Sequence, residues 1–270
     1  QLHFVPPHAP YQPLPKFDRF SDPDYAGNFD GSTNSIFTFD QRHRRPTPED
    51  LNQAIGLYDG NLRAGDDAVA DVFEALEARG RWDNTVILVT SDHGEAFYEH
   101  HRMSHNNTIY DEMLRVPFIL HLPDGFDRGG FNLDRMATLA DIVPTLLSTA
   151  SLEPNASLDG VNLLHAARRK NKPFDRYFVG RTAHSTPMRC IRTSRWKATL
   201  ANSGQGELFD LVEDPGEQRN LRHQHPEIFV ALGQLLTRQL LEPPSITGAV
   251  RNSDVSDSDR KMLEALGYVE

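Results

Sequence analysis

The chain has 270 residues, enough for one large α/β domain or for a main domain with a smaller appended one. Its formal net charge of −10 argues against a nucleic-acid partner, because proteins that bind a phosphate backbone normally present a basic face. The single cysteine, Cys190, excludes an internal disulfide framework and a cysteine-rich zinc cluster, and no apolar run reaches the length of a membrane span.

The N-terminal segment is predicted to be mostly irregular. "LHFV" (2–5) is typical of a short strand, and the proline-rich "PPHAPYQPLP" that follows excludes a helix or strand interior. Residues 18–47 are polar and rich in Asp, Ser and Arg, so we expect a surface loop there. A helix then begins at "TPED", with Thr47 as its N-cap and Asp50 three residues later, and its apolar pattern continues until Gly80.

Two segments further on are predicted to be strands buried in a sheet. "TVILVT" (85–90) is continuously apolar and β-branched, and "VPFILHL" (116–122) has a similar character. A helix followed by a buried strand implies a βαβ arrangement, so we expect the α/β class with a mainly parallel sheet flanked by helices. "LADIVPTLLSTA" (139–150) is predicted to be a helix with Asp141 near its cap.

The pattern changes after about residue 175. Three segments alternate polar and apolar residues between turns, which is typical of an antiparallel sheet: "RYFVGRT" (176–182), "MRCIRTSRWKATLA" (188–201) and "GELFDLVED" (206–214). "HPEIFVALGQLLTRQLLE" (225–242) is predicted to be an amphipathic helix. We therefore place a domain boundary in "KNKPFDR", between an α/β domain at 1–175 and a smaller α+β subdomain at 176–270.

Most of the candidate metal-ligating and catalytic side chains follow the first buried strand, in "SDHGEAFYEHHRMSH" (91–105). Ligands of an open parallel sheet bind beyond the carboxyl ends of its strands, and Asp92 and His93 are delivered there together. A carboxylate oxygen and a neutral imidazole nitrogen can face one divalent cation, and Gly94 allows the sharp turn that this requires. The alternative is that Asp92 caps a following helix and His93 is simply packed.

The other histidines differ in what their positions indicate. His101 and His105 are four residues apart, but the metalloprotease pattern His-Glu-x-x-His is absent, so a zinc site on one helix is not supported. His8 follows a strand-like run and could converge with Asp92 and His93 at strand ends. We interpret His101 as a bystander. Ordinary surface or core positions are expected for His3, His121, His184, His223 and His225.

Taken together, these segments resemble the sulfatase family of the alkaline-phosphatase-like superfamily. The matching pieces occur in family order and span nearly the whole chain: "LHFVPPHAPYQP", "NTVILVTSDHGEAF" with "EHH" and "SH", "YDEMLRVPFILHLP", "LADIVPTLL", "RWKATL", "ELFDLVEDPGEQRNL" and "LEALGYVE". The resemblance implies an alkaline-phosphatase-like sheet flanked by helices, followed by a smaller C-terminal antiparallel sheet and helix. It also implies a sulfuric ester hydrolase that acts on small-molecule or glycan sulfate esters.

The resemblance implies roles for individual residues. Asp92 and His93 match two metal ligands; the metal is usually calcium, and His93 in place of the common Asn leaves manganese, zinc or magnesium open. His8 matches a histidine that contacts the sulfate group or the leaving oxygen. His105 falls where many sulfatases have a sulfate-binding lysine, and where a phosphoryl-transferring branch has a histidine that binds phosphate or a second metal. His100 is a further candidate for substrate binding.

The resemblance also implies a nucleophile, which we expect upstream of this chain. In the family it is a Cys or Ser in the pattern Cys/Ser-x-Pro-x-Arg near the N-terminus, oxidised to formylglycine. Cys190 has no proline two residues on, so we interpret it as structural. The early Asp-Asp metal ligands are likewise expected upstream, since the Asp pair at 66–67 lies in a helical pattern. We therefore expect the C-terminal part of a sulfatase, which does not turn over aryl sulfates alone.

Two alternatives stay open at this point. The first is a phosphodiesterase, phosphonate hydrolase or phosphoethanolamine transferase of the same superfamily, which His93 together with His105 would suit. The second is a catalytically inactive metal- or glycan-binding fragment. The resemblance implies a periplasmic or secreted protein and leaves the cytoplasm open. The sequence does not indicate the substrate or the oligomeric state.

Overall fold

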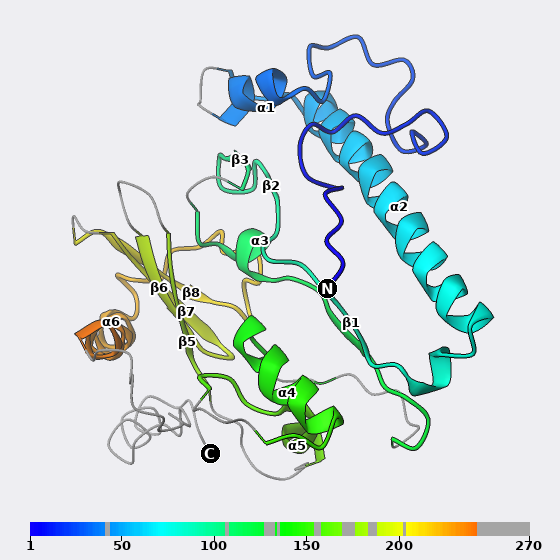
Figure 1. The fold of residues 1–270 in the computed structure, drawn as a ribbon. Coiled ribbons are helices and arrows are strands. Elements are labelled where there is room, and N and C mark those ends of the chain that lie inside the picture. Colours follow the sequence, from blue (N-terminus) through cyan, green and yellow to red (C-terminus); the bar gives the residue numbers. More distant parts are fainter. Residues whose placement is uncertain are drawn as a thin grey trace. The chain divides into compact units, whose positions relative to one another are not determined.

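The chain forms two compact units, residues 1–126 and residues 127–270 (Figure 1). The domain boundary that the sequence places near residue 175 stays a prediction. Across the part of the chain described here, no helix is both long enough and apolar enough to cross a membrane. The computed structural model describes residues 1–40, 44–105, 108–126, 133, 136–153, 158–168, 176–182, 188–201 and 204–241.

The first unit contains one long helix, α2 (Pro48–Ala78), drawn in cyan in Figure 1. Thr47 caps it as predicted: the Thr47 hydroxyl accepts a hydrogen bond from the Asp50 N–H at 3.2 Å, and the Asp50 carboxylate accepts one from the Thr47 N–H at 3.0 Å. This reciprocal capping box satisfies two backbone donors at the start of the helix. Gly80 follows the end of α2 with a φ of 59°, a conformation that glycine adopts without strain.

The N-terminal segment differs from the prediction in two places. Residues 1–5 form no strand with any part of the chain that the structure describes, and Leu2 is 66% exposed. A strand needs a neighbouring strand to complete its hydrogen bonds, and an apolar pattern alone does not supply one. Residues 18–47, expected as a surface loop, contain helix α1 (Thr33–Asp40). The helix forms because buried apolar residues, Phe39 among them, recur on one of its faces among polar neighbours.

The two apolar strands are present as β1 (Ile87–Thr90) and β4 (Phe118–His121). They pair antiparallel, with Thr90 opposite Phe118, so the predicted parallel pairing is wrong for these two strands. The reason lies in the connection between them. The chain leaves the end of β1 and returns to the adjacent end of β4, whereas a parallel pair requires a crossover to the opposite end.

Short elements flank and fill this connection. A 3-10 turn, η1 (Trp82–Asn84), precedes β1. Residues 91–117 contain a two-stranded hairpin, β2 (Ala96–Phe97) with β3 (Met103–Ser104), and then a single helical turn, α3 (Asp111–Leu114). The connection therefore carries "SDHGEAFYEHHRMSH" on a small ordered framework rather than on a plain loop.

The second unit is a four-stranded antiparallel sheet in the order β5-β6-β7-β8, with helix α6, and it confirms the predicted C-terminal sheet and helix. The helix expected at 139–150 is also present. Cys190 is fully buried on β6, in agreement with a structural role. The elements are η2 (Leu139–Asp141), α4 (Ile142–Thr149), α5 (Leu163–Arg168), β5 (Phe178–Arg181), β6 (Met188–Arg192), β7 (Trp196–Ala201), β8 (Gly206–Asp210) and α6 (Pro226–Leu241).

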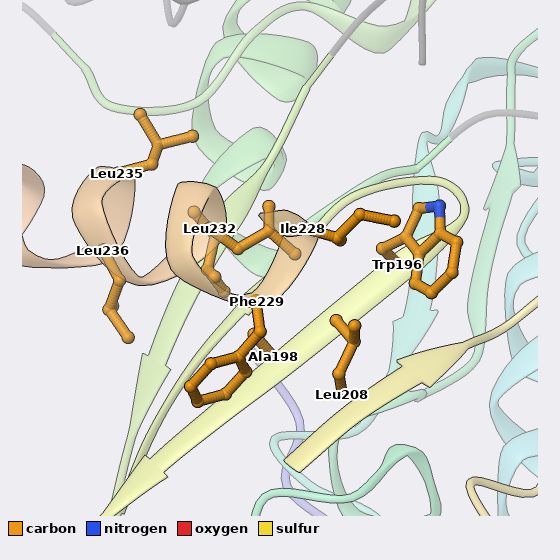
Figure 2. Packing of buried hydrophobic residues seen from close by; sticks show 9 residues of the cluster. Trp196, Ala198, Leu208, Ile228, Phe229, Leu232, Leu235 and Leu236 are labelled. Atoms are coloured by element: carbon orange, nitrogen blue, oxygen red, sulfur yellow. The ribbon is translucent and has the colours of Figure 1, made fainter. Parts of the chain in front are cut away.

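The core of this unit lies between the sheet and α6 (Figure 2). Leu232 of α6 belongs to one apolar cluster with Ala198 and Leu208 of the strands. Apolar burial of this kind is the main stabilising contribution in a small domain. The helical spacing of the leucines in "ALGQLL" thus places them on the face that the sheet covers.

Two buried ion pairs join segments of the second unit. The Arg176 guanidinium donates two hydrogen bonds to the Asp141 carboxylate, at 2.6 and 2.9 Å. The Lys197 ammonium lies 2.8 Å from the carboxylate of Glu217, and both side chains are fully buried. Since an unpaired buried charge is costly, each pair fixes the two segments that contribute to it.

Candidate active site

Asp92 and His93 follow β1 directly, at the strand end where the sequence places them. The turn that carries them is fixed by Gly94, whose N–H donates to the carbonyl of Met113 at 2.9 Å. A Cβ atom on Gly94 would lie 2.0 Å from the carbonyl oxygen of Glu112, so only glycine fits this approach of two backbones. The turn at the end of β1 is therefore held against the α3 segment.

The β2–β3 hairpin positions His105. Ala96 pairs with Ser104 in the ladder, so Glu95 and His105 are the next pair of neighbours across the two strands. The Nδ1 atom of His105 lies 3.3 Å from Oε1 of Glu95, whose side chain is only 6% exposed. The hairpin thus brings a buried carboxylate against the imidazole that the sequence singles out.

A third segment brings in His8 from the N-terminal loop. Two hydrogen bonds anchor this loop: the Tyr11 N–H donates to the carbonyl of Gly31 at 2.8 Å, and the Asn61 side-chain amide donates to the carbonyl of Pro10 at 2.9 Å. Tyr11 itself is fully buried in a cluster of apolar and aromatic side chains. These contacts hold the backbone next to His8 against helix α2.

The three segments converge on a group of three imidazoles. The ring centres of His93 and His105 are 4.5 Å apart, and those of His8 and His105 are 5.0 Å apart. Asp92 joins them, since its Oδ1 atom lies 3.7 Å from Nε2 of His93. Four of the five residues that the sequence selects are therefore neighbours in space, although their roles stay predictions.

His100, the fifth, makes contacts of another kind. Its Nδ1 atom lies 2.8 Å from the Glu112 carboxylate, and its ring stacks on Tyr110 with centres 3.5 Å apart and an angle of 7° between the planes. These contacts explain its burial by local packing. A role for His100 in substrate binding stays a prediction.

The charges around His105 favour its protonated form. The hydrogen bond to Glu95 raises the pKa of His105, burial lowers it, and the negative charges of Glu95 and Asp92 raise it further, with a net increase. Burial and the charge of Glu95 also raise the pKa of Tyr11, and burial with the charges of Glu95 and Asp59 raises the pKa of Tyr58 to about 12. The surroundings thus favour the protonated form of His105 and the neutral form of both phenols.

Glu95 is the residue that sequence reasoning missed. It stands in "SDHGE" two residues after His93, where it reads as an ordinary solvated carboxylate. The missing information was the register of the hairpin, which makes Glu95 the neighbour of His105 across the strands. Had the turn of that hairpin been located within residues 98–102, the pairing could have been derived from the sequence.

Asp92 and His93 fit two ligands of one divalent cation. The Nδ1 atom of His93 is 2.8 Å from the Gly94 carbonyl, so Nδ1 carries the hydrogen and the Nε2 lone pair stays available to a metal. The Asp92 side chain is 77% exposed, and the 3.7 Å between its oxygen and Nε2 is close to the separation of about 3.4 Å between neighbouring ligands of one calcium ion. Within the residues described, no group of three or more such side chains could hold an ion. A metal-binding role for this pair stays a prediction.

The pattern Cys/Ser-x-Pro-x-Arg occurs once in this chain. The prediction of an upstream nucleophile did not take this match into account. It runs from Ser185 to Arg189, in "STPMR". Ser185 lies outside the described residues, and Arg189 belongs to β6 in the second unit. The family pattern lies near the N-terminus, ahead of the metal-ligand strand, whereas this match follows it, so we do not assign Ser185 as a nucleophile.

Two family models match the chain. The sulfatase model matches residues 1–152, more than half of the chain and all of the residues that form the site. A second model, described as "N-sulphoglucosamine sulphohydrolase, C-terminal", matches residues 99–242. The matches follow one another along the chain and overlap between 99 and 152.

Curated proteins and solved structures agree with these models. A Delta 4,5-hexuronate-2-O-sulfatase of Bacteroides thetaiotaomicron is 30% identical over 194 residues, covering 66% of this chain and 40% of that protein. Arylsulfatase K of Danio rerio is 27% identical, covering 88% of this chain and 45% of that protein. The solved structure of a 2-O GAG sulfatase is 27% identical with a TM-score of 0.65, covering 72% of this chain and 44% of that one. The chain thus spans less than half the length of each of these three.

Proposed function

Because the chain belongs to the sulfatase family, we propose that it contributes to the hydrolysis of sulfate monoesters, on small molecules or glycans. One observation carries the proposal. The rings of His8 and His93 lie with their centres 5.0 and 4.5 Å from that of His105, next to the end of β1. A gathering of imidazoles beside a metal-binding carboxylate suits an anionic ester, whose charge must be neutralised.

His105 is the proposed anion contact. Its Nδ1 atom faces Glu95, so its Nε2–H, on the opposite side of the ring, is free to donate to a sulfate oxygen. The raised pKa of His105 keeps this group cationic at higher pH than an ordinary histidine. A charged donor forms a stronger hydrogen bond to an anionic oxygen than a neutral donor does.

His8 is the proposed proton donor to the leaving oxygen. Its Nδ1 atom is 2.7 Å from the Ala9 carbonyl, an acceptor that fixes the hydrogen on Nδ1. The Nε2 atom of His8 is therefore the position at which a proton is held for transfer. Protonation of a leaving alkoxide by a positioned histidine contributes typically about 10² to 10⁴-fold to a rate.

Asp92 and His93 are the proposed metal ligands. Sulfatases generally use a divalent metal and formylglycine, and a bound cation supplies Lewis acidity toward the sulfate oxygens. Calcium remains the first expectation from the family. The nitrogen of His93 also suits manganese or zinc, since calcium prefers oxygen ligands and imidazole is a common zinc ligand.

We propose further that the formylglycine and the remaining metal ligands lie on a segment outside these 270 residues. The chain matches 40% and 45% of the lengths of two curated relatives, which leaves room for such a segment. On this proposal the chain alone does not turn over aryl sulfates.

A phosphoryl-transferring enzyme of the same superfamily is the second candidate. The ring of His105 lies 4.5 Å from that of His93, a pairing that phosphate or a second metal would also suit. The identities of 27% and 30% to sulfatases favour sulfate esters over this candidate.

The proposal is tested with His105→Asn in the chain extended by its native upstream sequence. We expect the kcat/KM for an aryl sulfate to fall by about 100-fold or more, because the charged donor to the sulfate is lost. The matched control is His101→Asn, at an exposed position with a φ of 62° that asparagine tolerates. The control should stay within about twofold of wild type. A folded His105→Asn variant with wild-type kcat/KM contradicts the proposal.

A further inference from the structure

Glu95 contacts His105 in the function proposed above, but that function does not say why a carboxylate is buried at this position. Its side chain is 6% exposed. Its charge raises the pKa of both Tyr11 and Tyr58. The ring of Phe97 contacts both tyrosines, with centres 6.1 Å from Tyr11 and 5.1 Å from Tyr58. A carboxylate is costly to bury, so its partners should explain its presence.

We propose that Glu95 is a positioning residue, which accepts a hydrogen bond from Nδ1–H of His105 and thereby directs the Nε2 atom of that ring toward the bound anion. The proposal rests on the anion-binding role proposed for His105. It deepens that role by assigning a second residue, whose atoms do not touch the substrate.

The first support is the geometry of the pair. The Nδ1 atom of His105 lies 3.3 and 3.4 Å from the two oxygens of Glu95, so either oxygen can accept its hydrogen. A carboxylate only accepts hydrogen bonds, which fixes the hydrogen on Nδ1. Since the two nitrogens lie on different sides of the ring, Nε2 is turned away from Glu95. The orientation of His105 therefore follows from the place of the carboxylate.

The second support is that the protein backbone fixes both partners. The ladder pairs Ala96 with Ser104, and one further step along each strand reaches Glu95 and His105. Gly94, on the other side of Glu95, is pinned by its hydrogen bond to Met113. The backbone on both sides of Glu95 is held by hydrogen bonds, so its side chain has little conformational freedom. It can therefore restrict the His105 ring to a narrow range of angles.

The third support is the link from Glu95 to the His8 segment. Tyr11 is fully buried, and burial and the charge of Glu95 are the two largest causes of its raised pKa. Tyr11 is three residues after His8, on the loop that the Gly31 carbonyl anchors. The ring centre of Tyr11 also lies 6.1 Å from that of Phe97, two residues after Glu95, so the hairpin contacts the segment that supplies His8.

One other group competes for the role. The Ser104 hydroxyl also lies 3.3 Å from Nδ1 of His105 and can accept its hydrogen. Ser104 has a φ of 64° and precedes His105 directly, so its hydroxyl moves with the same backbone. The variants below separate the two: Glu95→Gln keeps an accepting oxygen without the charge, and Glu95→Leu keeps the approximate volume without any acceptor.

The experiment records ring nitrogen signals of His105 by NMR in the 270-residue chain, at one pH high enough for the ring to be neutral, so that only one ring nitrogen carries a hydrogen. We expect a protonated Nδ1 in wild type and in Glu95→Gln, and an altered Nδ1 signal in Glu95→Leu. The matched control is Glu99→Gln, in the same hairpin, which should leave the His105 signals unchanged. A titration with inorganic sulfate follows, in which Glu95→Leu should bind about tenfold more weakly than wild type.

The NMR signals and the sulfate titration test the two roles separately: the signals test the positioning role of Glu95, and the titration tests anion binding by His105. A wild-type His105 with an unprotonated Nδ1, or a folded Glu95→Leu variant with wild-type His105 signals, overturns the role of Glu95. The wild-type measurement decides this even if Glu95→Leu does not fold. Altered ring signals without any sulfate binding by wild type support the positioning role and contradict the anion-binding role of His105.

Discussion

The histidines of the site differ in the partner of one atom, Nδ1. In His8 and His93 a neighbouring backbone carbonyl lies beside Nδ1, at 2.7 and 2.8 Å. In His105 the partner is the buried carboxylate of Glu95. Each arrangement leaves Nε2 as the atom for ligand contact, so local contacts decide which nitrogen can serve the chemistry.

At this scale we predict that Asp92→Asn weakens divalent cation binding to the 270-residue chain by about tenfold or more, because the anionic ligand is lost. Manganese is the probe, and broadening of the His93 ring signals by NMR is the readout. Asp66→Asn serves as the control, since Asp66 is 69% exposed on α2 and pairs with Arg63. Equal broadening in Asp92→Asn and wild type would remove Asp92 from the metal site.

Among the elements, helix α2 depends on its first turn. The Asp50 carboxylate accepts from the Thr47 N–H and from the Tyr25 hydroxyl, and Phe29 bonds to that same hydroxyl at 2.9 Å. Burial raises the pKa of Asp50, but the hydrogen bonds from Thr47 and Tyr25 outweigh it, so the pKa is lowered. A single carboxylate thus joins the helix start to the loop before α1.

The lowered pKa of Asp50 predicts an acid-sensitive first unit. A folded-state pKa below the unfolded value gives stability that is complete above about pH 3.9 and is lost as pH falls through the folded pKa. In urea unfolding, the free energy of unfolding of wild type should therefore approach that of Asp50→Asn as pH falls from about 5 toward about 3. Burial raises the pKa of Asp59, so the stability of wild type relative to Asp59→Asn should instead increase as pH falls. A constant difference between wild type and Asp50→Asn would disprove this linkage.

Helix α6 gives the corresponding test in the second unit. Leu232 is 1% exposed in the cluster with Ala198 and Leu208, so Leu232→Ala should lower the free energy of unfolding by about 2–5 kcal/mol. Val230, which is 54% exposed on the same helix, is the control, and Val230→Ala should change it by about 0.5 kcal/mol or less. Urea unfolding followed by Trp196 fluorescence in a Trp82→Phe background measures both. Equal effects at the two positions would contradict the assigned face.

For the whole molecule, the sequence predicted elements with strong local signals. The capping box at Thr47, the C-terminal sheet and helix α6 were all readable because periodicity and caps are local. The direction of β4 relative to β1 was not, since an apolar run reports burial and not pairing direction. Helix α1 was missed because its buried residues stand among polar neighbours.

The site, too, could be predicted only in part from the sequence. "SDHG" after a buried strand and a histidine in a distant loop indicated His93 and His8, and the resemblance to sulfatases added His105; the three rings do converge. Glu95 was not selected, because its contact depends on hairpin register, which a single sequence does not state. The same holds for the buried pair of Lys197 and Glu217, whose partners are 20 residues apart.

The central claim is that these histidines serve sulfate ester hydrolysis together with an upstream nucleophile. The most direct test compares kcat/KM for an aryl sulfate and the matching aryl phosphate, using the 270-residue chain and the same chain with its native upstream sequence. We predict that the chain alone hydrolyses neither ester and that the extended protein prefers the sulfate. Preference for the phosphate, or metal-dependent sulfate hydrolysis by the 270-residue chain alone, would contradict the account.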